Sequence, residues 1–175
     1  MDARRVIEGA AAGAAAGLAA SWVMSQFHNR WKAASGEGQD EDDEPNTVKA
    51  ADAVAEATVG EPVPEEYRKP AGTAVHYGFG AFLGAVYGAA VELRPATAAG
   101  FGTAYGAAVS LFADEMAMPA LGFTPPAPEV PASTHLRGFV SHLVFGAALE
   151  GTRRLLMQAI REPGAPLQLP RISSP

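Results

Sequence analysis

Four apolar runs dominate the chain, separated by polar or proline-rich segments. Three of these runs, residues 9–27, 71–91 and 95–113, carry no charged side chain apart from one histidine. The fourth run is charge-free only over residues 138–149, but Arg137 and Arg153 are separated by about 24 Å of helix. Long arginine side chains can reach outward from both ends of such a segment. Because about 20 apolar residues cross a bilayer, the pattern predicts transmembrane helices over residues 6–27, 73–93, 95–118 and 134–156.

Small residues recur at every fourth position along these runs, which predicts close packing between helices. The glycines of this pattern are Gly9, Gly13, Gly17, Gly80, Gly84, Gly88, Gly102, Gly106 and Gly146. Glycine weakens an isolated helix by roughly 1 kcal/mol relative to alanine, whereas in a membrane it lets two backbones approach closely. The alternative is a soluble, alanine-rich bundle, but the runs lack the charged face of a soluble surface helix. We therefore predict an all-α, polytopic membrane protein with four transmembrane helices.

The four helices are predicted to form one domain over residues 1–162, with an acidic first loop over residues 28–72. Between His28 and Thr73 there are eleven acidic and five basic residues, which accounts for the net charge of −6. Within this loop, Asn46 or Thr47 can cap a short amphipathic helix that ends at Gly60. We expect that helix to lie on the outer membrane surface.

The last connection is rich in proline and is expected to form a lid over residues 119–132. Proline removes a backbone donor and interrupts regular helix. The residues that characterise this lid are Pro119, Gly122, Thr124, Pro125 and Pro126. Ser133 or Thr134 is expected to cap the fourth helix, and residues 163–175 are expected to form a flexible tail.

Basic side chains favour one orientation in the membrane. The six at the chain ends and in the short second connection are Arg4, Arg5, Arg94, Arg153, Arg154 and Arg161. The positive-inside rule then places both termini in the cytoplasm. A signal peptide cleaved near Ala19–Ser21 is the alternative for the first run. No basic field is present to hold nucleic acid, and the absence of cysteine excludes disulfides and thiolate metal sites.

Three stretches resemble the YagU family of bacterial inner-membrane proteins: HYGFGAFLGAVYGAAVELRP, MPALGFTPPAPEVP and SHLVFGAALEGTRR. The matching positions are His76, Tyr87, Gly88, Glu92, Pro95, Pro119, Gly122, Thr124, Pro125, Pro126, His142, Glu150, Arg153 and Arg154. The resemblance covers roughly the C-terminal half of the chain. It implies a location in the bacterial inner (plasma) membrane and brings no established reaction.

Ionisable residues near both ends of the predicted spans are the candidates for chemistry. Histidine titrates near neutral pH, and carboxylates inside membranes often serve proton or ion pathways. The candidate proton- or ion-responsive residues are His76, Asp114, Glu115, His142, Glu92 and Glu150. The alternative is that such groups pair to satisfy burial, as Glu150 can with Arg153 and Arg154 at helical spacing.

The sequence favours a non-enzymatic membrane protein without a cofactor. Motifs for phosphate loops, serine hydrolases and zinc proteases are absent. A metal site formed by two histidines with Asp114 or Glu115 is an alternative, but no local histidine spacing supports it. We expect a pH-responsive or ion-handling protein in contact with the lipid bilayer. The alternative is a structural protein that uses its glycines to associate with another copy or another membrane protein.

Overall fold

A computed structural model of the chain describes residues 2–35 and 45–163, and every regular element in these residues is helical. The elements, in chain order, are α1 (Ala3–Ser35), α2 (Asn46–Val59), α3 (Glu65–Leu93), η1 (Pro95–Gly102), α4 (Thr103–Phe112), η2 (Ala113–Ala117), α5 (Met118–Ala120), η3 (Ala127–Glu129) and α6 (Ala132–Arg161). The all-α prediction is therefore confirmed for the described residues.

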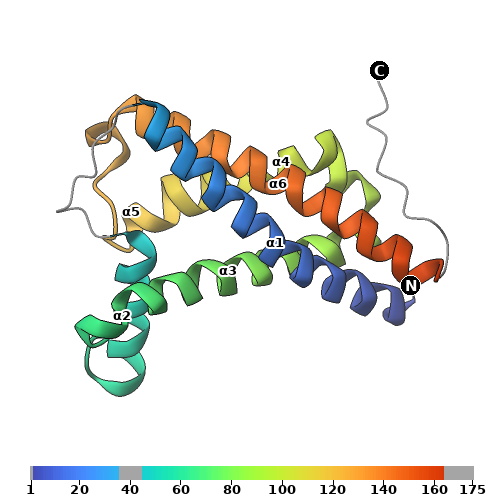
Figure 1. Cartoon of the computed structure of the whole chain (residues 1–175), viewed down its shortest axis with the longest axis horizontal. Helices are drawn as coiled ribbons and strands as arrows, with labels where there is room; N and C mark the ends of the chain where they lie inside the picture. Colours follow the sequence, from blue (N-terminus) through green and yellow to red (C-terminus); the bar gives the residue numbers. More distant parts are fainter. Residues whose placement is uncertain (1, 36–44, 164–175) are drawn as a thin grey trace.

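The helices α1, α3, α4 and α6 run alternately up and down as one bundle (Figure 1). The bundle has two ends, which we name by their contents. At the arginine end α1 begins and α6 ends. At the lid end α2 lies beside the chain between α5 and α6, and Lys49 Nζ of α2 donates to the carbonyl oxygen of Phe123 at 3.0 Å.

Helices α1 and α3 pack closely through glycines that face one another. A Cβ atom on Gly13 would overlap the carbonyl oxygen of Gly84, and one on Gly84 would overlap that of Gly13. The same reciprocal overlap joins Gly9 with Gly88. Gly17 likewise faces Gly80. Because each step of four residues along α1 is matched by four residues back along α3, the two helices are antiparallel and in backbone contact.

The pair α4–α6 is also antiparallel and closed partly by glycine. Gly102 and Gly146 face each other, and a Cβ on Gly106 would overlap the carbonyl oxygen of His142. The two pairs meet in a core formed by α1, α3 and α6. The buried apolar residues of that core are Ala16, Ala20, Tyr87, Val91, Phe145 and Leu149.

Three boundaries differ from those that the sequence predicts. Helix α1 extends to Ser35, and α3 begins at Glu65, so much of the predicted loop 28–72 is helical. The predicted span 95–118 is regular α-helix only from Thr103, because Gly100, Phe101 and Gly102 have positive φ angles of 60°, 56° and 83°. Such left-handed residues interrupt a right-handed helix.

The helix caps also differ from the prediction. Proline precedes both α2 and α6, as Pro45 and Pro131, and neither helix has a side-chain cap. Proline suits a helix start because its missing N–H would have no intrahelical acceptor there. The expected capping by Asn46 or Thr47 and by Ser133 or Thr134 is therefore wrong. Gly60 does end α2, with a φ of 84°. The predicted tail, apart from residue 163, lies outside the described residues.

Two helices in the described part of the chain, α1 and α3, are long and apolar enough to cross a membrane by length and composition alone. Helix α4 is too short for this criterion, and α6 carries several charged side chains in its second half. The crossing of the membrane by all four predicted spans therefore stays a prediction.

Candidate functional site

At the arginine end, one fully buried carboxylate gathers donors from two helices. Tyr87 of α3 donates its hydroxyl to Glu150 Oε2 at 2.9 Å. Arg153 donates to Glu150 through Nε at 2.8 Å and Nη2 at 3.1 Å, and Arg154 donates through Nε at 2.5 Å. The two arginines reach the same carboxylate because they follow it by three and four residues on α6.

A second carboxylate ties this group to the end of α3. Arg161 Nη2 lies 2.7 Å from Glu92 Oε2, and Arg153 Nη1 lies 3.7 Å from Glu92 Oε1. Arg153 therefore bridges the two glutamates. We call the whole group the Glu150 cluster: Tyr87, Glu92, Glu150, Arg153, Arg154 and Arg161.

The burial of the Glu150 cluster decides what its members can do. The side chain of Glu150 is 0% exposed and that of Arg153 is 8% exposed. Removing such charges from water is costly, and the cost is offset only when each charge is paired and hydrogen-bonded. Both oxygens of Glu150 accept hydrogen bonds, so this carboxylate is an anchor that holds α3 against α6.

Two carboxylate–histidine pairs lie on the α4–α6 side toward the lid end. His142 Nδ1 is 3.2 Å from Asp114 Oδ2, and His135 Nδ1 is 2.6 Å from Glu115 Oε1. His135 Nε2 also contacts the carbonyl oxygen of Ala127 at 3.0 Å. We call these two contacts the histidine pairs. The second one borders a mainly apolar hollow of about 530 Å³ between α4 and α6.

Two adjacent residues of η2 pair with the same helix, α6. In a regular α-helix neighbouring side chains point about 100° apart, which follows from 3.6 residues per turn. Asp114 and Glu115 lie instead in a π-helical turn, Ala113–Ala117. Such turns widen the helix locally and are frequent at functional sites. Ser110 adds a hydrogen bond to Asp114 Oδ2 at 3.2 Å.

His76 lies apart from the histidine pairs, at the lid end of the α1–α3 contact. Its Nε2 is 3.1 Å from Ser25 Oγ and 3.3 Å from the carbonyl oxygen of Ser21. Ser21 continues the glycine series of α1, and His76 continues that of α3. The row of glycine contacts between α1 and α3 is therefore followed, at the lid end, by the polar contact of His76 with Ser25 and Ser21.

The candidate residues of the sequence thus form three groups. Glu92 and Glu150 meet in the Glu150 cluster, Asp114, Glu115 and His142 meet in the histidine pairs, and His76 is separate. Sequence reasoning missed the hydroxyl of Tyr87 and the reach of Arg161 to Glu92. The position of Tyr87 directly before Gly88 could have indicated its role, because Gly88 lies in the close contact between α1 and α3.

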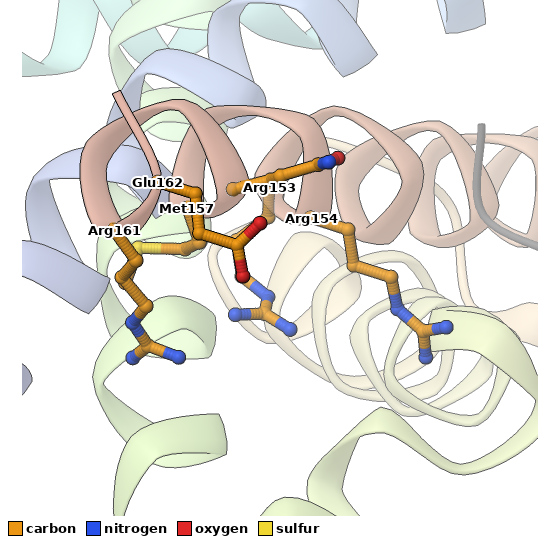
Figure 2. A pocket seen from close by; sticks show the side chains of 6 residues that line it. Arg153, Arg154, Met157, Arg161 and Glu162 are labelled. Carbon is orange, nitrogen blue, oxygen red and sulfur yellow. The ribbon is translucent and has the colours of Figure 1, made fainter. Parts of the chain in front are cut away.

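A metal centre is not assembled among residues 2–35 and 45–163. No group of three or more metal-ligating side chains is assembled there. A hollow of about 250 Å³ lies against the last turns of α6 (Figure 2). The side chains that line it are Arg153, Arg154, Met157, Gln158, Arg161 and Glu162.

Comparison with known families places the chain in one of them. Residues 61–151, more than half of the sequence, match the family described as proteins of unknown function, DUF1440. The protein belongs to this family, which is the YagU-like family that its sequence resembles. Searches of curated proteins and of solved structures give no match. The matched segment contains the histidine pairs and Glu150, but ends before Arg153.

Proposed function

We propose that this protein is a four-span protein of the bacterial inner membrane that responds to pH through its histidine pairs. The observation that carries the proposal is the π-helical turn, where two adjacent carboxylates each meet a different histidine of α6. An imidazole is the side chain whose charge changes near neutral pH. Helix packing at this contact therefore depends on protonation.

The distribution of polar groups on α6 supports a crossing by this helix despite its charges. The polar side chains of Ser141, Glu150 and Arg153 are buried, whereas Leu136, Phe139 and Ile160 are exposed. A helix with this inverted pattern suits apolar surroundings, because its polar groups are satisfied inside the protein. The other three helices of the bundle also expose large apolar side chains, including Trp22 on α1, Phe82 on α3 and Leu111 on α4.

Reporter fusions test the membrane arrangement. A reporter that is active only outside the cytoplasm should be active when fused after Glu61 or Glu129. It should be silent when fused after Arg161, because an even number of crossings returns the chain to the cytoplasm. A reporter that is active after Arg161 and silent after Glu129 would indicate the opposite orientation in the membrane.

The pH response follows from the groups that face His142. Asp114 lies opposite it, and Ser110 also binds that carboxylate, while Glu115 and His135 form the neighbouring pair. When the imidazole gains a proton, its contact with Asp114 becomes an ion pair in surroundings of low polarity. When the proton leaves, the neutral imidazole has only its hydrogen bonds to offer to the carboxylate of Asp114 and the carbonyl oxygen of Gly138. We expect acidification from pH 7 to pH 5 to strengthen the contact of α6 with η2.

The direct test compares the wild type with His142→Gln, which keeps a polar side chain and cannot become charged. Thermal unfolding in detergent is measured at several pH values from 5 to 7. The wild type should gain stability relative to the variant as the pH falls. Parallel profiles for the two proteins would mean that His142 is a polar structural contact without a sensing role.

A second measurement separates sensing from transport. Purified protein in liposomes is given a proton gradient, and proton flux is followed with and without a counter-ion gradient. Flux that His142→Gln abolishes would extend the proposal to proton handling. The structural alternative, in which the glycine series binds a partner, is less favoured because those glycines already pack against each other within the chain.

A further inference from the structure

The hollow at the end of α6 lies outside the histidine pairs and has no part in the proposed pH response. Three of its six lining residues are arginines, and all three come from the last three turns of α6 (Figure 2). Glu162 is the lining residue of opposite charge, and Glu92 and Glu150 pair with these arginines from the protein side, so the hollow has no excess of positive charge. What it offers to an anionic group is the accessible guanidinium N–H groups of Arg154 and Arg161.

Carboxylates on the protein side hold the arginines in place. Arg154 donates its Nε to Glu150, and its guanidinium lies 4.8 Å from the centre of the Phe101 ring. Arg161 donates through Nη2 to Glu92. A guanidinium that is already oriented loses less conformational freedom when it binds a ligand.

The two outer arginines remain accessible although they are held. The side chain of Arg154 is 41% exposed and that of Arg161 is 47% exposed. Arginine presents several N–H groups in one plane, which fits the oxygens of a phosphate group through parallel hydrogen bonds. Arg153 lies behind them in a buried position, where it pairs with Glu150 and Glu92.

Apolar side chains occur at the same end of the bundle as this largely polar hollow. Met157 lines it, Ile160 is exposed on the same turn of α6, and Leu93 is exposed at the end of α3. A ligand with a phosphate and acyl chains would match both features, with its phosphate on the arginines and its chains along the exposed apolar side chains.

We infer that this hollow binds the phosphate group of a membrane lipid headgroup. The inference rests on the proposed membrane location and extends it, because the arginine end is the cytoplasmic end in that arrangement. Glu162 limits the charge that the hollow accepts, which favours a phosphodiester with one negative charge over a group with several. The bound lipid would fix the last turns of α6 beside the end of α3.

The test uses three probes that separate the phosphate from the chains. Detergent-solubilised full-length protein is mixed with dioctanoyl phosphatidylglycerol, with dioctanoylglycerol, which lacks the phosphate, or with glycerol phosphate, which lacks the chains. The rise in melting temperature with probe concentration gives an apparent affinity. We expect a saturable rise with the complete lipid and a much smaller one with either fragment.

Variants assign the effect to the hollow. Arg161→Gln and the double variant Arg154→Gln, Arg161→Gln should bind the lipid roughly tenfold more weakly or worse, because each loses a charge-assisted hydrogen bond. Arg94→Gln is the matched control, since it removes the same charge from an exposed position at the same end, outside the hollow. Each variant is compared with itself without lipid, so a change in its basal stability cancels.

Each outcome decides the inference. Equal weakening by Arg94→Gln would reveal a non-specific charge effect and overturn the assignment. A full rise with glycerol phosphate would make this a site for soluble phosphoesters, and a full rise with dioctanoylglycerol would make the arginines irrelevant. A protein that stays soluble without detergent after cell lysis would contradict the membrane location itself, which is a different failure from the loss of lipid binding by extracted protein.

Discussion

The two antiparallel helix pairs, α1–α3 and α4–α6, pack through different residues, although glycine lies at the closest points of both. Between α1 and α3, three glycines of one helix face three of the other, and a serine and a histidine follow at the lid end. Between α4 and α6, glycine faces glycine once, then Gly106 faces His142, and Asp114 follows. The α1–α3 contact has no charged side chain along most of its length, whereas the α4–α6 contact includes the carboxylate of Asp114.

This difference separates a fixed contact from one that can change. Two backbones that touch through glycine have one close packing distance, because no side chain can rotate to adjust it. The α4–α6 contact ends in a π-helical turn whose two carboxylates face histidines of α6, and histidine is the side chain that titrates near neutral pH. We therefore expect the α4–α6 pair to respond to conditions and the α1–α3 pair to act as the support.

The largest expected effect comes from the group that joins the two pairs. Glu150→Ala removes the shared acceptor of Tyr87, Arg153 and Arg154. Breaking a buried ion pair on one side typically costs about 3–5 kcal/mol, because the remaining charge stays buried without its partner. The measurement is the free energy of unfolding in detergent.

The matched control for that change is Glu8→Ala, which also removes a glutamate from an (i, i+4) pair with arginine. Its partner Arg4 has a side chain that is 84% exposed, so we expect a loss of at most about 1 kcal/mol. Similar losses for the two variants would show that the Glu150 cluster does not hold the pairs together.

The next effect compares the two glycine contacts directly. Gly84→Leu and Gly106→Leu each force a side chain against the backbone of a neighbouring helix, which typically costs about 1–3 kcal/mol. Gly84→Leu should cost more, because its Cβ would also lie 2.9 Å from the Cα of Gly17, whereas Gly106 has 3.4 Å to the Cα of Gly146.

Ala108→Leu is the control for both glycine variants, since Ala108 is exposed on α4. It should change the free energy of unfolding less than either of them. A larger loss for Gly106→Leu than for Gly84→Leu would reverse the assignment of the rigid and the responsive pair.

The sequence indicates the glycine contacts and part of the Glu150 cluster because both rest on spacing within one helix. Gly80, Gly84 and Gly88 are four residues apart, and Arg153 and Arg154 follow Glu150 at i+3 and i+4. The break at residues 95–102 is not visible in composition, because an apolar run does not reveal positive φ angles such as that of Phe101. The π-helical turn is hidden for the same reason.

Contacts between residues far apart in the sequence also cannot be predicted from spacing within one helix. The contact of Arg161 with Glu92 joins residues 69 positions apart, and Tyr87 reaches Glu150 over 63 positions. Both depend on the register of α3 against α6, which packing alone decides. The pairing of His142 with Asp114 could be suggested from the order of the helices, whereas the pairing of His135 with Glu115 could not.

The smallest expected effect distinguishes the two histidines that lie within the helix contacts. His142 faces a carboxylate at 3.2 Å, whereas the polar contacts of His76 are the neutral groups of Ser25 and Ser21. His142→Gln should therefore remove a pH-dependent part of the stability, on the order of 1 kcal/mol or less between pH 5 and 7. His76→Gln is the comparison, because glutamine can replace the hydrogen bonds that His76 makes with Ser25 and Ser21. The measurement is thermal unfolding of the wild type and both variants in the same detergent across that range. A change of slope with His76→Gln and none with His142→Gln would transfer the pH response to the α1–α3 pair, and the comparison of the two helix contacts would have to be reversed.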